Sequence, residues 1–377
     1  MCIMRRLYQE ILEEKKRIEF NMTEGEILTK LIHDAHNLSD ETKQLFETLD
    51  NAIGTILGML SQKFGKFVIE SKDSNLDSLQ AIGVDGSFQV IGGMGGIWYV
   101  PLSSVRIIFK GGVEGSVESK YFATVRQIKA IDESQAKKYS SYLMLLLESD
   151  EIERIANENF SNFYVFLDGP IIDPPFIEDN PYVLPNKYTQ KRINAILGTL
   201  KNENRILGCV KRIRDRRLIE YLSSQFSKTS SKIDNLLNNF QNDLYLIATM
   251  FKHYRFSPNS GYTGPLSTIL IPLRPSNEME NKYVKQGINI YYFFYQRDGR
   301  SPILRVEIAT EGEIDNKEFK ELLKALNYWI LPGHGLPVPA LLAHEKCTIR
   351  EGCAQVLYEE IITEESTTSP IFNLWIR

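Results

Sequence analysis

The sequence has 377 residues, of which 43% are hydrophobic and 11% are aromatic. This composition is ordinary for a globular protein with a large buried core, and it excludes a disordered or fibrous chain. The formal net charge of -4 excludes a uniformly basic nucleic-acid-binding protein, so any such contact would have to come from local basic patches.

The cysteines and the N-terminal residues indicate a cytoplasmic protein. The sequence contains four cysteines that are too scattered for a zinc site or a CxxC pair: Cys2, Cys209, Cys347 and Cys353. Such thiols are typical of the reducing cytoplasm. The first twenty residues carry charges throughout, and no later stretch is long and apolar enough to span a membrane. We therefore expect no signal peptide and no membrane partner.

Residues 1–66 are predicted to form an N-terminal helical segment, and residues 67–377 are predicted to form one further domain. Thr23–Glu26 has the form of a capping box, and Ser39–Asp40 can cap a second helix. Apolar residues recur at helical spacing over Leu45–Leu60. A stripe of this kind usually packs on the core of its own chain, and a dimer or partner surface is the alternative.

Three β-strands joined by tight turns are predicted next, over Ala81–Val90, Ile97–Phe109 and Lys120–Ile128. The glycine-rich turn Gly92–Gly96 resembles a nucleotide-binding loop only superficially. It lacks the GxGxxG spacing, and a strand follows it in place of a helix. We interpret it as a hairpin turn.

A long helix over Ser134–Asn157 and a short apolar strand over Phe163–Leu167 come next. A wholly apolar strand suits burial on both faces, and a right-handed crossover would return it parallel to the first strand. This order of elements is the opening of the ribonuclease-H-like fold. We therefore predict an α/β protein with a ribonuclease-H-like mixed sheet core and flanking helices.

The remaining residues are predicted to complete a mixed α/β fold. The predicted helices cover Tyr188–Leu200, Arg217–Lys228, Asp234–Met250, Asn316–Trp329 and Pro339–Thr363. The predicted strands cover Ile206–Val210, Ser267–Ile271, Ile288–Tyr295 and Ile303–Ile308. The turn Asp298-Gly299 joins the last two strands as a hairpin.

Two aspartates follow the same local pattern, in which an apolar strand sequence leads to an aspartate and then a glycine. They are Asp85, in GVDGS, and Asp168, in FLDGP. Either motif alone could be an Asx turn. The predicted topology, however, places the two on neighbouring strands, where the carboxylates would repel each other unless a cation lay between them. A pair of divalent ions held there would activate a water molecule and stabilise the leaving oxygen of a phosphodiester.

Further ligand candidates lie on two helices. Glu148 and Glu151 are three residues apart, so they share one face of the helix that precedes Asp168, and either could reach the site. A solvated helix face is the alternative for any single glutamate. His344 is the fourth candidate, because imidazole joins carboxylates around Mn²⁺-type ions. A lone histidine is otherwise more often a core or surface residue.

The segment KRIRDRR, which begins at Lys211, is the densest basic run in the chain. It could bind phosphates without regard to base sequence, and a solvated helix end is the alternative of similar weight. Lys211 follows an apolar strand and is expected to point into the cleft, so Lys211, Arg212 and Arg214 are the DNA-binding candidates. We interpret Arg305 and Glu307 as a structural ion pair on one strand.

The order of these motifs resembles the NurA nucleases, which act with the HerA translocase in archaeal DNA-end processing. The matching segments are Asp85–Ser87, Phe166–Pro170, Leu207–Lys211, Arg305–Glu307 and Gly335–His344. The resemblance implies a ligand set of Asp85, Glu151, Asp168 and His344, with the family's spacing favouring Glu151 over Glu148. Many members have tyrosine where this chain has Leu336, so the role of that hydroxyl is not assigned here.

The resemblance also implies an activity, a cofactor and partners. It implies a metal-dependent DNA nuclease, both a single-strand endonuclease and a 5′-to-3′ exonuclease, that acts in resection of double-strand-break ends. It implies Mn²⁺, as two ions with Mg²⁺ as the alternative, and a homodimer that works with a hexameric HerA-like ATPase. Two other readings of the residues stay open. One is a ribonuclease-H-like nuclease acting on RNA or hybrids, and the other is an inactive module that docks on a translocase or binds DNA.

Overall fold

The computed structural model describes residues 25–72, 79–158, 160–172, 181–182, 185–226, 231–257 and 261–368. Residues 1–24 of the predicted helical segment lie outside this range, as does the start of the predicted capping box. Within the described ranges, no helix is both long enough and apolar enough to cross a membrane. The boundary predicted between residues 66 and 67 stays a prediction.

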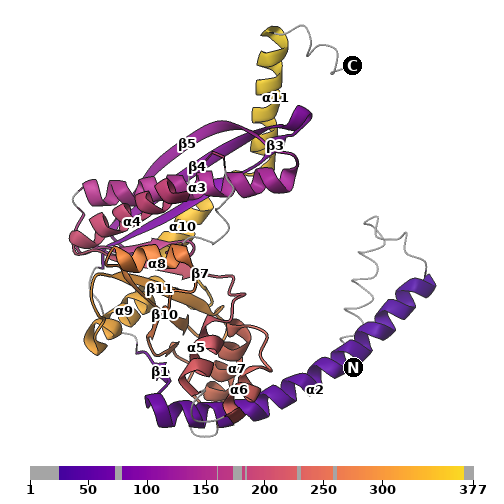
Figure 1. Cartoon of the computed structure of the whole chain (residues 1–377), viewed down its shortest axis with the longest axis vertical. Coiled ribbons are helices and arrows are strands. Elements are labelled where there is room, and N and C mark those ends of the chain that lie inside the picture. Colours follow the sequence, from indigo (N-terminus) through magenta and orange to yellow (C-terminus); the bar gives the residue numbers. More distant parts are fainter. Residues whose placement is uncertain are drawn as a thin grey trace.

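The strands of the described chain join one mixed sheet (Figure 1). They are β1 (Val68–Glu70), β2 (Ala81–Phe88), β3 (Ile91–Gly92), β4 (Ile97–Lys110), β5 (Ser116–Lys129), β6 (Tyr164–Leu167), β7 (Arg205–Val210), β8 (Leu266–Thr268), β9 (Ile271–Pro272), β10 (Asn289–Gln296) and β11 (Leu304–Thr310). Their order is β1-β8-β10-β11-β7-β6-β2-β4-β3, and β5 pairs with β4 while β9 pairs with β10.

The helices cover the sheet and extend beyond it (Figure 1). They are α2 (Gly25–Phe64), α3 (Glu133–Asn157), α4 (Pro185–Lys201), α5 (Arg217–Phe226), α6 (Ser231–Leu237), α7 (Asp243–Phe256), α8 (Glu278–Lys285), α9 (Asn316–Trp329), α10 (Val338–Cys347) and α11 (Glu351–Thr368). Figure 1 shows the N-terminal part of α2 and the C-terminal part of α11 extending away from the sheet.

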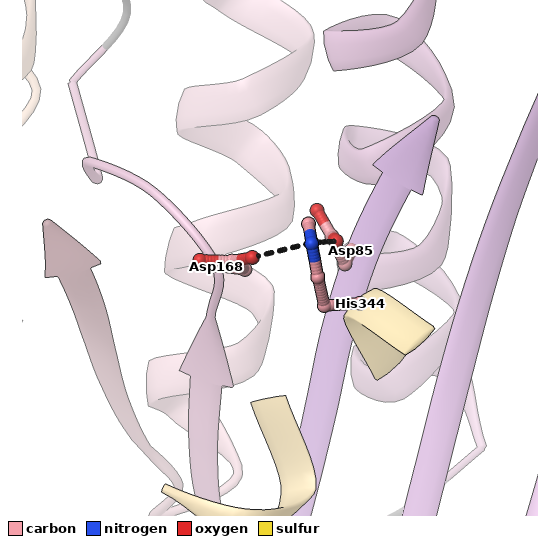
Figure 2. A group of neighbouring side chains, drawn as sticks. All are labelled: Asp85, Asp168 and His344. Atoms are coloured by element: carbon pink, nitrogen blue, oxygen red, sulfur yellow. Dashed lines mark hydrogen bonds and ion pairs between the residues drawn. The ribbon is translucent and has the colours of Figure 1, made fainter. Parts of the chain in front are cut away.

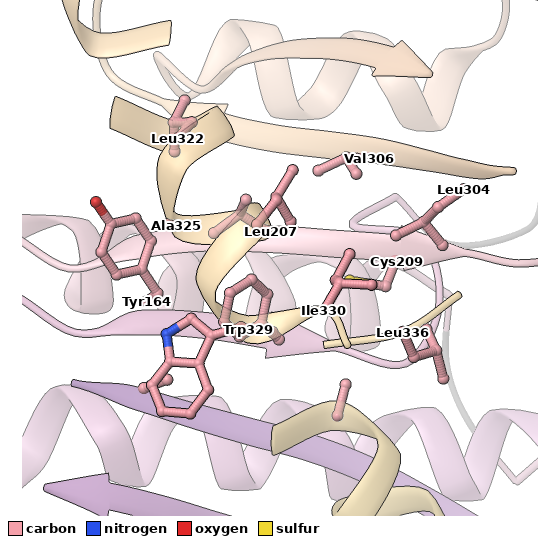
Figure 3. Packing of buried hydrophobic residues seen from close by; sticks show 14 of the residues in the cluster. Tyr164, Leu207, Cys209, Leu304, Val306, Leu322, Ala325, Trp329, Ile330 and Leu336 are labelled. Carbon is pink, nitrogen blue, oxygen red and sulfur yellow. The ribbon is translucent and has the colours of Figure 1, made fainter. Parts of the chain in front are cut away.

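The central strands have apolar residues on both faces, and helices pack against each face. One face packs on α3, α4 and α8, where Ile152, Ile193 and Tyr283 are fully buried. The opposite face packs on α9 and α10, with Trp329 at its centre and its ring 5.1 Å from that of Phe109 (Figure 3). A separate cluster joins α2, α5, α6 and α7 to the end of the sheet near β1 and β8.

The centre of the sheet confirms the predicted ribonuclease-H-like topology. β2 runs antiparallel to β4 and parallel to β6, and β6 runs parallel to β7. All four residues of β6 are buried, as its wholly apolar sequence predicts. Val84 lies opposite Leu167, and the backbone N–H of Asp168 donates to the carbonyl of Val84 at 3.1 Å. Val84 and Leu167 are thus paired on two neighbouring parallel strands, and Asp85 and Asp168 are the residues that come directly after them.

Three predicted helix boundaries were wrong. Ser39–Asp40 lies inside the single helix α2, because interior Ser and Asp cost a helix less than about 1 kcal/mol each. The helix predicted over 234–250 is two helices, because the side chain of Asn242 accepts from the N–H of Tyr245 and starts α7. The last predicted helix divides between α10 and α11, where the N–H of Ile349 donates to Oγ of Ser87.

The strand predicted over 267–271 was also wrong as a single element. It divides into β8, which pairs with β1 and β10, and β9, which pairs with β10 alone. β1 itself was not predicted, because three residues are too short to show an alternating pattern. The predicted hairpins at Gly92–Gly96 and Asp298–Gly299 are confirmed.

Close packing of α10 on β2 depends on Gly83. A Cβ at this position would lie 2.0 Å from the carbonyl oxygen of Pro339 in α10. We expect Gly83→Ala to force α10 away from the sheet and to lower the free energy of unfolding by about 3 kcal/mol or more, as overpacked core positions do. The control is Gly58→Ala in α2, where an added Cβ meets nothing within 4 Å and should stabilise the helix slightly. Urea unfolding measures both, and equal stabilities would contradict the predicted contact.

Candidate metal centre

Three side chains that are distant in the sequence meet beside β2 and just beyond the C-terminal end of β6 (Figure 2). Nδ1 of His344, from α10, lies 2.8 Å from Oδ2 of Asp85 and 2.9 Å from Oδ2 of Asp168. One ligand atom from each residue lies within 4.8 Å of the other two. The structure thus brings together three of the four predicted ligands.

The site concentrates negative charge in a partly dry environment. Burial and, second, the negative charge of Asp168 together raise the pKa of Asp85 from 3.8 to about 7. Hydrogen bonds from the thiol of Cys347, at 3.2 Å, and from the N–H of Gly86, at 2.9 Å, oppose this rise. Nζ of Lys211 supplies a nearby positive charge, 2.7 Å from Oδ2 of Asp168.

A divalent cation fits this arrangement. Oδ1 of Asp168 is buried and has no hydrogen-bond partner among the described residues. The single nitrogen of His344 that faces both carboxylates cannot donate one proton fully to each of them. A cation bound here would engage the unpaired oxygen and offset both negative charges. Two carboxylates and an imidazole are a donor set that suits Mn²⁺.

The prediction that Glu151 is the helix ligand stays a prediction, because the structure places this carboxylate in ion pairs and not in the group of Asp85, Asp168 and His344. The carboxylate of Glu151 is buried in an ion pair with Arg106, with Oε2 2.7 Å from Nε, and it also accepts from Ser104 and pairs with Arg154. Glu148 instead lies beside β2, where its Oε1 would be 3.3 Å from a Cβ at Gly86. Three residues move a helical side chain about 4.5 Å along the axis, so Glu148 is proposed as a second candidate for the helix ligand beside Glu151.

Paired substitutions separate the two glutamates. We expect Glu148→Gln to lower the cleavage rate by about 10- to 100-fold with a small change in stability, the range seen when groups that support metal ligands are altered. We expect Glu151→Gln to leave the rate of the folded enzyme unchanged but to cost about 3 kcal/mol, because Arg106 loses a buried partner. Rates at saturating metal and urea midpoints measure the two effects. A large rate loss in Glu151→Gln at unchanged stability would establish Glu151 as the helix ligand.

The predicted basic residues border the same site. Lys211, Arg212 and Arg214 line a cavity of about 620 Å³ together with Asp85, Asp168 and His344. Arg212 and Arg214 are exposed, and within the described chain neither pairs with a carboxylate. Lys211 points at Asp168, as expected from its place after an apolar strand.

The loop that follows Asp168 is held by two residues whose part in the site was not predicted. Arg192, from α4, is 1% exposed and donates to the carbonyls of Pro170 and Ile171, each at 3.0 Å. Glu307 accepts from the N–H of Ile171 at 2.9 Å, so its ion pair with Arg305 also supports the site. In the sequence, the only indication that Arg192 supports this loop was the presence of an arginine on an otherwise apolar face of its helix.

Two further positions near the site depart from expectation. Cys347 is one helical turn beyond His344 and donates its thiol proton to Asp85, and burial raises the pKa of this thiol well above its usual range. Its spacing of three from His344 could have predicted the contact. Leu336 is buried in the core shared with α9 and α10, so it contributes packing there.

The strand order and the paired aspartates define the class of this protein as a nuclease with a ribonuclease-H-like core. The family model described as the NurA domain matches residues 79–349, which is most of the chain. The chain therefore belongs to the NurA family of nucleases. A search among curated proteins found no match.

Solved structures of the same family are similar to this chain. The NurA nuclease from Sulfolobus solfataricus is 14% identical, with a TM-score of 0.61 over 92% of this chain and 99% of that one. A second NurA structure is 11% identical, with a TM-score of 0.49 over 86% and 96%. A NurA bound to dAMP and manganese is 14% identical, with a TM-score of 0.45 over 84% and 95%. At 14% identity, the similarity to the Sulfolobus solfataricus structure supports the fold alone.

Proposed function

We propose that this NurA-family nuclease cleaves DNA with divalent metal ions held by Asp85, Asp168 and His344, with Glu148 beside them. The observation that carries the proposal is the unpaired, buried Oδ1 of Asp168 next to a histidine nitrogen shared by two carboxylates. Mn²⁺ is the proposed ion, as two ions per site with Mg²⁺ as the alternative, because the donor set mixes imidazole with carboxylates.

The residues around the carboxylates have separate roles in binding the metal ions and the DNA. The ions, when bound, would activate a water molecule and stabilise the departing oxygen. Asp85 and Asp168 hold the positive charge beside β2 and just beyond the C-terminal end of β6, and Arg192 and Glu307 keep the loop after Asp168 in place. Lys211 can turn from Asp168 to a phosphate oxygen, and Arg212 and Arg214 can contact neighbouring phosphates.

We further propose the finer activity and the partners that family membership supports. These are single-strand endonuclease and 5′-to-3′ exonuclease activity, and a role in resection of double-strand-break ends. The proposed assembly is a homodimer that works with a hexameric HerA-like ATPase. Membership of the NurA family is the support for each of these proposals.

A substrate and metal panel tests the proposal. Single-stranded DNA, duplex DNA, RNA and an RNA–DNA hybrid, each labelled at the 5′ or the 3′ end, are incubated with Mn²⁺, Mg²⁺ or EDTA. We expect Mn²⁺-dependent cutting of single-stranded DNA, with products from the 5′ end and from internal positions. Faster cutting of RNA or hybrid would establish the alternative nuclease. A lack of cutting on every substrate with either metal would favour the docking module.

A further inference from the structure

The cavity at the carboxylates continues along α5 into a second, smaller one. The two cavities share Arg217 and Leu273, and the second, of about 220 Å³, is also lined by Tyr221 and Arg274. We propose that this second cavity binds an unpaired base of a single DNA strand whose phosphodiester lies at the carboxylates. The inference rests on the proposed function and adds a binding subsite at a distance from the cleaved bond.

Arg274 offers a fixed, planar surface for a base. Its guanidinium carbon lies 5.2 Å from the ring centroid of Tyr221, a cation–π contact, and one of its NH groups donates to Oγ of Ser224 at 3.0 Å. Tyr221 is steadied in turn by Phe64, whose ring is stacked with it at 6.4 Å. Bases stack on arginine planes as they do on aromatic rings, and two contacts already orient this plane. Arg274 is therefore held in position before any strand arrives.

The positive charge along the two cavities is suited to a phosphate backbone. Arg274 is exposed and, within the described ranges, has no carboxylate partner. It continues the line of unpaired cations that Arg212 and Arg214 begin beside the carboxylates. Arg217, between them, is already paired with Asp215 and Glu280 and adds little free charge. A chain with a net charge of -4 thus places three arginines that lack a carboxylate partner among the described residues, Arg212, Arg214 and Arg274, along one path from the site, with the acidic Glu220 also lining the second cavity.

The size of the second cavity favours an unpaired base over other ligands. Its volume is below the range of roughly 300–1,000 Å³ usual for small-molecule sites, so a whole nucleotide cofactor is not the expected occupant. A duplex keeps the faces of its bases stacked on one another, whereas a single strand can give one face to Arg274. The expected ligand is therefore single-stranded DNA.

Affinity as a function of strand length tests the inference. Oligothymidylates of 4 to 16 nucleotides, a span taken from known single-strand sites of about 4–16 nucleotides, are bound to the full chain in EDTA and followed by fluorescence anisotropy. We expect Arg274→Ala to bind the longer strands about tenfold more weakly, the effect of one lost stacking contact, and to bind the shortest strand as wild type does. Its cleavage of the shortest strand should be unchanged.

Two further variants distinguish stacking from charge and from unfolding. Arg274→Lys keeps the charge and loses the plane, so we expect weaker binding of long strands with an unchanged salt dependence. In Arg274→Ala, by contrast, the slope of log affinity against log salt should fall by about 0.7. Arg300→Ala, at an exposed hairpin position away from both cavities, is the matched control and should bind as wild type.

Three outcomes would overturn the subsite. They are wild-type affinity of Arg274→Ala for every length, an equal loss at every length, and full affinity of Arg274→Lys for long strands. Each would be found in an enzyme that still cleaves DNA. Failure of the proposed function is a different result, in which the wild type neither binds nor cuts DNA of any length.

Discussion

Asp85→Asn and Asp168→Asn are each expected to abolish cleavage, by at least about a thousandfold, which corresponds to about 4 kcal/mol of transition-state stabilisation. Each substitution keeps the size of the side chain and removes the charge that holds the cation. Initial rates on labelled single-stranded DNA with Mn²⁺ measure the effect.

DNA binding by the two variants and a matched control substitution show whether the loss of cleavage is specific to the metal site. Both variants should still bind DNA, because Arg212, Arg214 and Arg274 are untouched. Asp34→Asn, at an exposed position of α2, changes the same charge away from the site and should cut at the wild-type rate. Near-normal cleavage by both site variants would refute the assignment of the carboxylates.

The stability of the metal-free protein is expected to fall as pH rises from about 4 to about 7. The pKa of Asp85 is raised by burial and by Asp168 from its ordinary 3.8 to about 7, so the fold favours the protonated carboxyl. The stabilisation this gives is complete below pH 3.8, is lost progressively between pH 3.8 and about 7, where only the unfolded chain is ionised, and does not change further at higher pH. A shift of this size corresponds to a loss on the order of 4 kcal/mol. Urea unfolding in EDTA between about pH 4 and 8 measures it.

Asp85→Asn isolates this effect from a second buried carboxyl. Burial also raises the pKa of Asp243 to about 7, so its ionisation lowers stability over the same pH range in every variant. The difference between wild type and Asp85→Asn cancels that contribution. We expect the variant to be the more stable protein at pH 8 without metal. Mn²⁺ at well above 1,000 times its Kd should reverse the order, since a ligand at 1,000 times its Kd already stabilises by about 4.1 kcal/mol. Parallel pH profiles would contradict the assignment of the raised pKa to Asp85.

The central part of the fold could be predicted because its sequence signals are local and strong. A wholly apolar four-residue strand such as β6 is stable only between two others, which fixed its place next to β2. Asp85 and Asp168, which come directly after the paired residues of these two strands, were then expected to be neighbours. His344 could be placed only through the resemblance to the family, because nothing local in α10 distinguishes a ligand from a core histidine.

The rest of the site depends on how helices are rotated and packed, and a single sequence does not show this. Glu148 and Glu151 are less than one turn of α3 apart. Arg106 on β4 forms its ion pair with Glu151, which the sequence alone does not show. The support of the Asp168 loop by Arg192 depends on how α4 packs against α3. The division of the last predicted helix likewise follows from a hydrogen bond to Ser87 on β2, far away in the sequence.

Anomalous X-ray scattering from crystals soaked in Mn²⁺ is the most direct test of the proposed metal centre. The account predicts a manganese peak bounded by Asp85, Asp168 and His344, within coordination distance of Oδ1 of Asp168, and no peak there in Asp85→Asn. A wild-type site without manganese, or manganese bound only elsewhere on the chain, would contradict it.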